Sequence, residues 1–128
     1  MKLATIQAAA FKSTFEVLKD ILNDVNIYFR KEGMYIVTLD TARTSLVDIY
    51  LSADNFEEYE CDREEIIAGI NISNTFKLLK TITNNDVLQI EINCKEYMNI
   101  EISSDTKKTN TKFQLCLLYT SDAADESS

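Results

Sequence analysis

Apolar residues recur with the period of an α-helix in two short stretches of the chain. In residues 11–23 they follow the spacing i, i+4, i+7 and i+11, which places them on one side of a helix: Phe11, Phe15, Leu18 and Leu22. A second stretch, residues 75–83, gathers Leu78, Leu79 and Ile82 on one side. Ser73 or Asn74 precedes it, and either can cap a helix N-terminus. The pattern predicts two amphipathic helices.

Most of the remaining chain alternates between apolar and polar residues or is rich in β-branched and aromatic ones, as is typical of strands. We expect strands at residues 3–8, 26–30, 34–39, 45–52, 66–72, 87–92, 97–103 and 107–118. The order is therefore strand, helix and three strands, repeated once. This duplicated β-α-β-β-β order predicts an α+β fold in which an antiparallel sheet has both helices on one face, because that arrangement buries both apolar stripes.

The link between two of these strands, residues 40–45, contains neither Gly nor Pro. Those two residues are the ones that most readily form tight turns. The link also places a cation, Arg43, between Leu39 and Leu46. From the residues alone, an ordinary strand connection with a solvated arginine is the simplest interpretation.

Charge is distributed unevenly along the chain, whose 21 acidic and 13 basic residues give a formal net charge of −8. Residues 54–65 hold seven of the acids and a single base, Arg63. Taken alone, such acidity argues against a nucleic-acid partner and is typical of a solvated acidic loop that keeps a protein in solution.

The expected helices depart from this acidity. At 100° per residue, Lys12 and Lys19 fall about 20° apart on the first helix, which also carries acids. On the second helix, Lys77 and Lys80 straddle the centre of the polar side, and the segment has no acid. Lysines that simply solvate a helix surface would give the same pattern, so the residues alone leave the role of these four open.

Several classes of function lack the residues that they need. The chain has no His and only two glycines, so it offers neither a catalytic base of the usual kind nor a Gly-rich phosphate loop. Its three widely spaced cysteines suit reduced thiols in a cytosolic or nuclear protein, not a disulfide framework or a zinc site. No apolar run approaches the ~18 residues that span a bilayer. We expect no enzyme activity, metal, cofactor or membrane partner.

Three stretches of the chain carry a specific resemblance. They are GMYIVTLDTARTSLVDIYL at residues 33–51, FEEYECDR at 56–63 and AGINISNTFKLLK at 68–80. In this order and spacing, over some 115 residues, the chain resembles the N-terminal domain of the proliferating cell nuclear antigen (PCNA) family, the eukaryotic and viral sliding clamps.

The resemblance implies a DNA-clamp fold and the function of a DNA polymerase processivity factor in replication and repair. Such a clamp is a ring of two-domain subunits, a homo-oligomer when full length, that encircles double-stranded DNA without reading its sequence. The helices line the hole, which assigns DNA binding to Lys12, Lys19, Lys77 and Lys80. The resemblance also places a pocket for the clamp-interacting peptides of polymerases and other partners at Leu39, Arg43 and Leu46. It implies a location in the nucleus, or at a viral replication site for a virus-encoded clamp.

Two features depart from the family pattern. The chain holds one clamp domain, which we expect at residues 1–118, where a clamp subunit has two. From Tyr119 the sequence looks like translated sequencing adapter, so we expect residues 119–128 to be a non-native, disordered tail. Two other interpretations stay open: a clamp-fold paralogue, such as a checkpoint-clamp subunit or a viral transcription cofactor, and a plain protein-interaction module.

Overall fold

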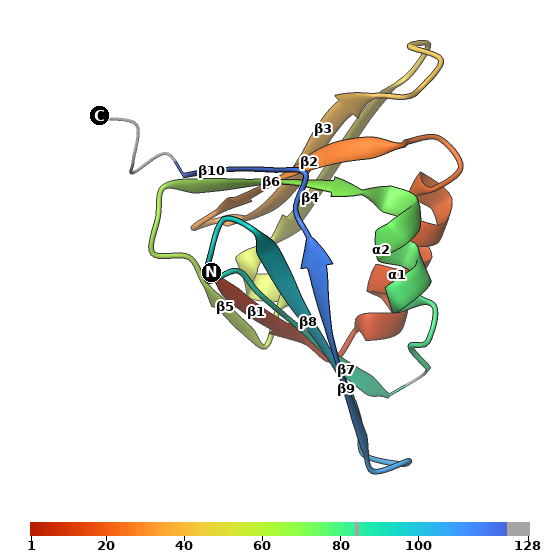
Figure 1. Ribbon diagram of the computed structural model, residues 1–128, viewed down its shortest axis with the longest axis vertical. Helices are drawn as coiled ribbons and strands as arrows, with labels where there is room; N and C mark the ends of the chain where they lie inside the picture. Colours follow the sequence, from red (N-terminus) through yellow and green to blue (C-terminus); the bar gives the residue numbers. More distant parts are fainter. Residues whose placement is uncertain (84, 123–128) are drawn as a thin grey trace.

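The strands form two five-stranded antiparallel sheets, and two helices pack beside them (Figure 1). The structure is a computed structural model, and it describes residues 1–83 and 85–122. The first sheet has the order β5 (Glu58–Glu60), β1 (Lys2–Thr5), β7 (Asp86–Glu91), β8 (Tyr97–Ser104) and β9 (Thr109–Cys116). The second has the order β10 (Tyr119–Asp122), β6 (Glu65–Asn71), β2 (Asp24–Arg30), β3 (Gly33–Leu39) and β4 (Leu46–Ser52).

The predicted α+β class and the duplicated element order are confirmed, but the strands form two sheets where one was expected. The units are β1-α1-β2-β3-β4 and β6-α2-β7-β8-β9, with α1 at Ala8–Leu18 and α2 at Ile72–Leu79. The first strand of each unit joins the sheet of the other unit: β1 pairs with β7, and β6 pairs with β2. Each helix therefore carries the chain from one sheet to the other.

Both helices begin earlier than the sequence predicted. The cap of α2 is Asn71, whose side-chain oxygen accepts a hydrogen bond from the backbone N–H of Asn74 at 2.9 Å, and not Ser73 or Asn74. Asn71 is also the last residue of β6, so the chain passes directly from strand to helix. Among the described residues, no helix is long and apolar enough to span a membrane.

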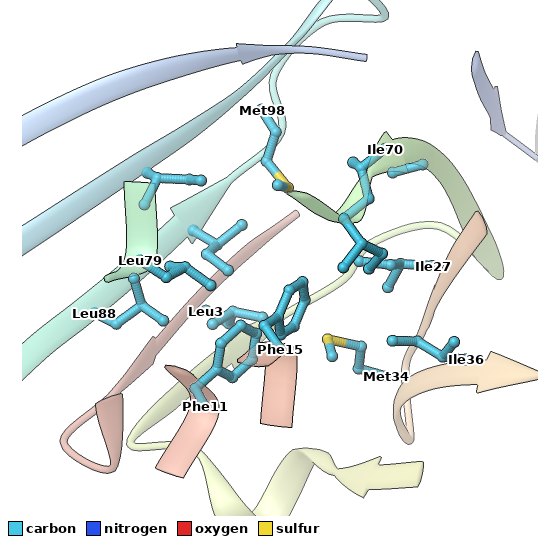
Figure 2. Packing of buried hydrophobic residues seen from close by; sticks show 14 of the residues in the cluster. Leu3, Phe11, Phe15, Ile27, Met34, Ile36, Ile70, Leu79, Leu88 and Met98 are labelled. Atoms are coloured by element: carbon cyan, nitrogen blue, oxygen red, sulfur yellow. The ribbon is translucent and has the colours of Figure 1, made fainter. Parts of the chain in front are cut away.

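One hydrophobic core lies between the two sheets and the helices (Figure 2). The rings of Phe11 and Phe15 in α1 stack with their centroids 5.1 Å apart. Around them gather buried side chains from both sheets and from α2, among them Leu3, Ile27, Met34, Ile36, Ile70, Leu79, Leu88 and Met98. Because both sheets contribute to this one core, neither unit could bury its apolar residues alone.

The acidic stretch at residues 54–65 is more than the solvated loop that we expected. It includes the short strand β5, which pairs with β1. The Glu57 carboxylate accepts a hydrogen bond from the backbone N–H of Ile6 at 2.8 Å, and Glu58 pairs with Lys2 at 3.5 Å. Two of these acids therefore help to fix the edge of the first sheet.

The end of the chain also differs from the expectation of a tail without structure. Residues 119–122 form β10, which pairs with β6 through the register Tyr119↔Gly69 to Asp122↔Ile66. Residues 123–128 lie outside the described residues. Whether the segment is native stays a prediction.

Gly33 occupies a position that excludes any side chain. Its φ of +154° lies where L-residues are strained, and a Cβ atom there would come within 2.4 Å of the backbone oxygen of Leu51. The ring of Tyr50 would be 2.8 Å away. The turn between β2 and β3 therefore depends on this glycine.

We expect Gly33→Ala to lower the free energy of unfolding by about 1–3 kcal/mol, because the new Cβ would force the β3–β4 backbone to shift. Denaturant unfolding followed by circular dichroism would measure the change. Thr111→Ala, at an exposed position on β9, serves as the control and should change stability by no more than about 0.5 kcal/mol. Equal stability of the Gly33 variant and the parent would contradict this account of the turn.

Candidate nucleic-acid interface and partner pocket

The two helices lie side by side and contact each other at one side of the molecule (Figure 1). Each directs most of its apolar side chains into the core, and its other side faces away from the sheets. Those exposed positions are Ala10, Ser13, Glu16, Val17 and Asp20 around α1, and Ser73, Asn74, Lys77, Lys80 and Thr81 around α2. The exposed side of α2 therefore carries cations and neutral groups, whereas that of α1 carries uncharged groups and two acids.

Lys12 and Lys19 are held by neighbouring groups. The ammonium group of Lys12 donates a hydrogen bond to the backbone oxygen of Ile82 at 2.8 Å, just beyond the end of α2. Lys19 pairs with Asp20 at 3.3 Å, and its ammonium lies 5.5 Å from the centre of the Phe76 ring. Both lysines therefore help to join the helices, and part of their charge is already compensated.

Lys77 and Lys80 are both exposed, on the side of α2 opposite its buried residues Ile72, Thr75 and Leu79. Within the described residues, neither ammonium group has a hydrogen bond or an ion pair. A long flexible side chain of this kind can reach an anion without first breaking a contact. The structure thus divides the four predicted lysines into two that are held and two that are free.

Leu39 and Leu46 lie directly opposite each other at the ends of β3 and β4. Their exposed fractions are 46% and 66%, so both are apolar side chains left open to solvent. Val37, two residues before Leu39 on the same face, is 47% exposed. This end of the β3–β4 hairpin is an exposed apolar patch of the kind that marks interaction sites.

The turn at residues 40–45 is built by the Asp40 side chain, which explains why it needs neither Gly nor Pro. Its carboxylate accepts hydrogen bonds from the backbone N–H groups of Thr44 at 2.8 Å and Ser45 at 3.3 Å, and from the Thr44 hydroxyl at 3.2 Å. The bond from the Thr44 N–H is the main cause that lowers the pKa of Asp40 below its usual value. Within this turn, Arg43 adopts a left-handed backbone conformation, with φ of 58°.

A hollow of about 410 Å³ lies beside this turn. Leu39 and Arg43 line it, whereas Leu46 does not. The backbone N–H of Thr41 donates a 3.0 Å hydrogen bond to the oxygen of Ile21, which ties the turn to the link between α1 and β2. Of the three predicted pocket residues, the structure thus places two around one hollow and the third on the adjoining apolar patch.

The sequence analysis missed an aromatic row on the same face of the second sheet. The rings of Tyr35 and Tyr50 stack with centroids 4.5 Å apart, and the Arg30 guanidinium lies 4.8 Å from Tyr35 and 5.9 Å from Tyr28. A 2.7 Å hydrogen bond to Glu65 holds Arg30 in place and raises its pKa. The alternation of residues in β3 and β4 could have indicated this row, since Tyr35 and Tyr50 occupy positions on the outward face.

Metal-ligating groups do not gather anywhere in the described part of the chain: no three His, Cys, Asp or Glu side chains come together there. The thiol of Cys61 lies 3.4 Å from the backbone oxygen of Arg63, while Cys94 and Cys116 are exposed. The two candidate sites instead offer cations on α2 and apolar surface at the end of the β3–β4 hairpin, and both suit binding.

Comparison with known protein families matches residues 1–126 to "Proliferating cell nuclear antigen, N-terminal domain". The match extends past residue 118, where we expected the clamp domain to end. Among curated proteins, the chain is 35% identical over 118 residues to "Probable DNA polymerase sliding clamp 1" of Paramecium bursaria Chlorella virus 1. It is 32% identical over 105 residues to "DNA polymerase sliding clamp 3" of the archaeon Sulfurisphaera tokodaii, and 31% identical over 112 residues to "Proliferating cell nuclear antigen 1" of Plasmodium falciparum.

These matches cover 91%, 82% and 87% of the chain but only 45%, 42% and 40% of the three relatives. The chain thus spans less than half the length of the curated relatives that it matches. Among solved structures, it is similar to a chain of the PCNA2–PCNA3 complex from Sulfolobus tokodaii, with a TM-score of 0.86 and 26% identity. That similarity covers 94% of this chain and 48% of the other.

We expect Asp40→Ala to loosen the turn at residues 40–45, because the N–H groups of Thr44 and Ser45 would lose their acceptor. Amide hydrogen exchange at Thr44 and Ser45 should accelerate about tenfold or more, with little change in the core strands. Asp48→Ala, which removes an exposed carboxylate from β4, is the matched control and should leave both rates unchanged.

Acid should act in the same way as the substitution. Because the folded pKa of Asp40 is lowered, its contribution is fully present above the ordinary aspartate pKa of about 3.9 and is lost as the pH falls through the lowered value. Unchanged exchange at Thr44 and Ser45 in the Asp40 variant would show that other contacts hold the turn.

Proposed function

The chain belongs to the proliferating cell nuclear antigen family, as its N-terminal domain, and we propose that it is part of a sliding-clamp subunit. In this proposal the complete subunit forms a homo-oligomeric ring around double-stranded DNA and acts as a processivity factor that keeps DNA polymerase on its template. The names of the relatives, which are DNA polymerase sliding clamps and a proliferating cell nuclear antigen, favour this function over a plain protein-interaction module.

The observation that carries the DNA-binding part of the proposal is the pair of free lysines on α2. In a chain of net charge −8, the exposed side of this helix holds Lys77 and Lys80 and no acid. Two mobile ammonium groups can contact phosphates of any sequence without gripping a base edge. Such contacts are weak, salt-sensitive and readily exchanged, which is what sliding along DNA requires.

Lys12 and Lys19 have a secondary role in this proposal. Their contacts with Ile82 and Phe76 hold the two helices against each other, and Asp20 compensates part of the charge of Lys19. They add positive potential near the DNA, while Lys77 and Lys80 make the direct phosphate contacts. Most of the acids of residues 54–65, by contrast, lie around β5 at the edge of the first sheet, where they would repel DNA from the outside of the ring.

Partner proteins are proposed to dock on the exposed apolar patch at the end of the β3–β4 hairpin. Leu39 and Leu46 would contact the apolar side chains of a clamp-interacting peptide, and Arg43 would border the site and select among peptides by its charge. The role is one of binding and not of catalysis. We propose that the protein acts in the nucleus, or at a viral replication site if a virus encodes the chain.

Replacing Lys77 and Lys80 by Ala tests the DNA interface. In a ring-forming subunit that includes a C-terminal clamp domain, the double variant should bind duplexes of all sequences more weakly and to the same extent. The slope of log K against log [salt] is negative, and its magnitude should decrease by about one for each phosphate that the variant leaves without a cation. Fluorescence anisotropy with labelled duplexes at several salt concentrations would measure both.

The matched control removes the same charge from elsewhere: Lys107→Ala with Lys108→Ala, in the exposed turn between β8 and β9. Its salt slope should equal that of the parent. An unchanged slope in the Lys77/Lys80 variant, or the same decrease in both variants, would remove α2 from the DNA interface.

Leu46→Asp tests the partner pocket. A carboxylate on the apolar patch would be covered without a partner when a peptide binds, so the affinity for a clamp-interacting peptide should fall at least about tenfold. Val17→Asp is a close control, because Val17 on α1 is 65% exposed and Leu46 is 66% exposed. Equal peptide affinity of the Leu46 variant and the parent, measured by titration calorimetry, would show that the pocket lies elsewhere.

A further inference from the structure

A row of stacked side chains crosses the outward face of the second sheet and ends at the edge of that sheet. It begins with Glu65 on β6, whose carboxylate accepts the 2.7 Å hydrogen bond from Arg30 on β2. The Arg30 guanidinium lies 4.8 Å from the ring centre of Tyr35 on β3, and that ring stacks on Tyr50 of β4 at 4.5 Å. Because β2 and β4 flank β3, Arg30 and Tyr50 approach the Tyr35 ring from opposite sides.

Three contacts hold the ring of Tyr50 in place at the open end of this row. Its hydroxyl donates a 3.0 Å hydrogen bond to the backbone oxygen of Glu32, and the Tyr35 ring covers one of its faces. Gly33 leaves room for the ring edge, since a Cβ atom there would come within 2.8 Å of it. Among the described strands, β4 is the last of this sheet, and Tyr50 is 47% exposed. The second face of this ring is therefore both fixed and accessible.

Two exposed carboxylates accompany the open ring. Asp48 lies two residues earlier on the same face of β4, and Glu32 lies in the turn that accepts the Tyr50 hydroxyl. Within residues 1–83 and 85–122, neither carboxylate has an ion pair, and Lys31 of the same turn pairs with neither. The open end of the row thus combines an aromatic face with negative charge, but no cation stacks on it.

We propose that the open face of Tyr50 binds the guanidinium of an arginine side chain on a partner protein, while Asp48 and Glu32 balance its charge. The other end of the row is the precedent within the molecule: there Arg30 stacks on Tyr35, and Glu65 balances the charge. A planar guanidinium can stack on a ring and pair with a carboxylate at once, whereas an ammonium group is more strongly hydrated. The carboxylates would repel the phosphates of a nucleic acid.

This arginine site is separate from the proposed partner pocket and does not rest on the proposed function. The pair Tyr35↔Tyr50 lies four residues along both strands from the pair Leu39↔Leu46. At ~3.3 Å per residue, that separation is about 13 Å. None of the side chains of the arginine site lines the hollow beside the turn at residues 40–45. A partner can therefore use this site whether or not the pocket is occupied.

NMR titration of the ¹⁵N-labelled 128-residue chain with the peptide acetyl-Gly-Gly-Arg-Gly-Gly-amide tests the site. We expect saturable shifts of the backbone amides around Tyr50 on β4. A peptide with citrulline, the neutral analogue of arginine, should bind about fivefold more weakly or worse, because it keeps the shape of the side chain and loses the charge. A lysine peptide should bind about two- to fivefold more weakly than the arginine peptide.

Variants of the chain separate the ring from the charge. Tyr50→Leu should weaken binding of the arginine peptide about three- to tenfold, and Asp48→Asn about two- to threefold. Asp48→Asn leaves the ring in place, so it tests the site even if loss of the ring disturbs β4. Tyr97→Leu is the matched control, since Tyr97 is a 36% exposed tyrosine on β8 of the first sheet, and its affinity should equal that of the parent.

Three results would overturn the proposal: equal binding of the citrulline or lysine peptide, shifts centred on the acids of residues 54–65, or equal affinities of the parent and the Tyr50 and Asp48 variants. Leu39→Ala, at the partner pocket, should leave the affinity for the arginine peptide unchanged. Loss of that affinity in the Leu39 variant would show that the peptide binds at the pocket, which would refute the arginine site and leave the proposed function standing.

Discussion

The exchange of first strands between the two β-α-β-β-β units determines the rest of the structure. Because β1 pairs with β7 and β6 pairs with β2, each helix must cross from one sheet to the other. The helices therefore run in opposite directions on the same side of the molecule and share one core with both sheets. That geometry exposes the polar side of α2, with Lys77 and Lys80, on a surface separate from the apolar end of the β3–β4 hairpin.

Local periodicity predicted the helices and most strands, because each element buries one face and the apolar residues of that face recur at a fixed spacing. It could not predict that the strands form two sheets, since the exchange of β1 and β6 depends on pairings between distant residues. It also placed the start of α2 too late. Asn71 ends β6 and caps the helix at once, and a residue that serves two elements gives no separate signal in the sequence. The strand β5 was missed because its three residues include two acids.

The candidate sites were predictable to different degrees. Helical spacing was sufficient to place Lys77 and Lys80 on an exposed polar side, but it could not show that Lys12 is held by the Ile82 carbonyl. The resemblance to the clamp family pointed to Leu39, Arg43 and Leu46, while the role of Asp40 in forming their turn required the hydrogen bonds of the structure. The hollow beside the turn at residues 40–45, which Asp24 also lines, had no signal in the sequence, because it lies where the β2–β3 ladder has stopped.

The central claim is that the exposed side of α2 faces duplex DNA while the outward face of the second sheet faces solvent and partners. Photo-cross-linking tests it most directly, in a ring-forming subunit loaded on circular duplex DNA. A cross-linking residue would replace either Ser73, exposed on α2, or Tyr50, which is 47% exposed on the second sheet. The account predicts DNA adducts from position 73 and none from position 50. Adducts from position 50, or equal yields from both positions, would contradict it.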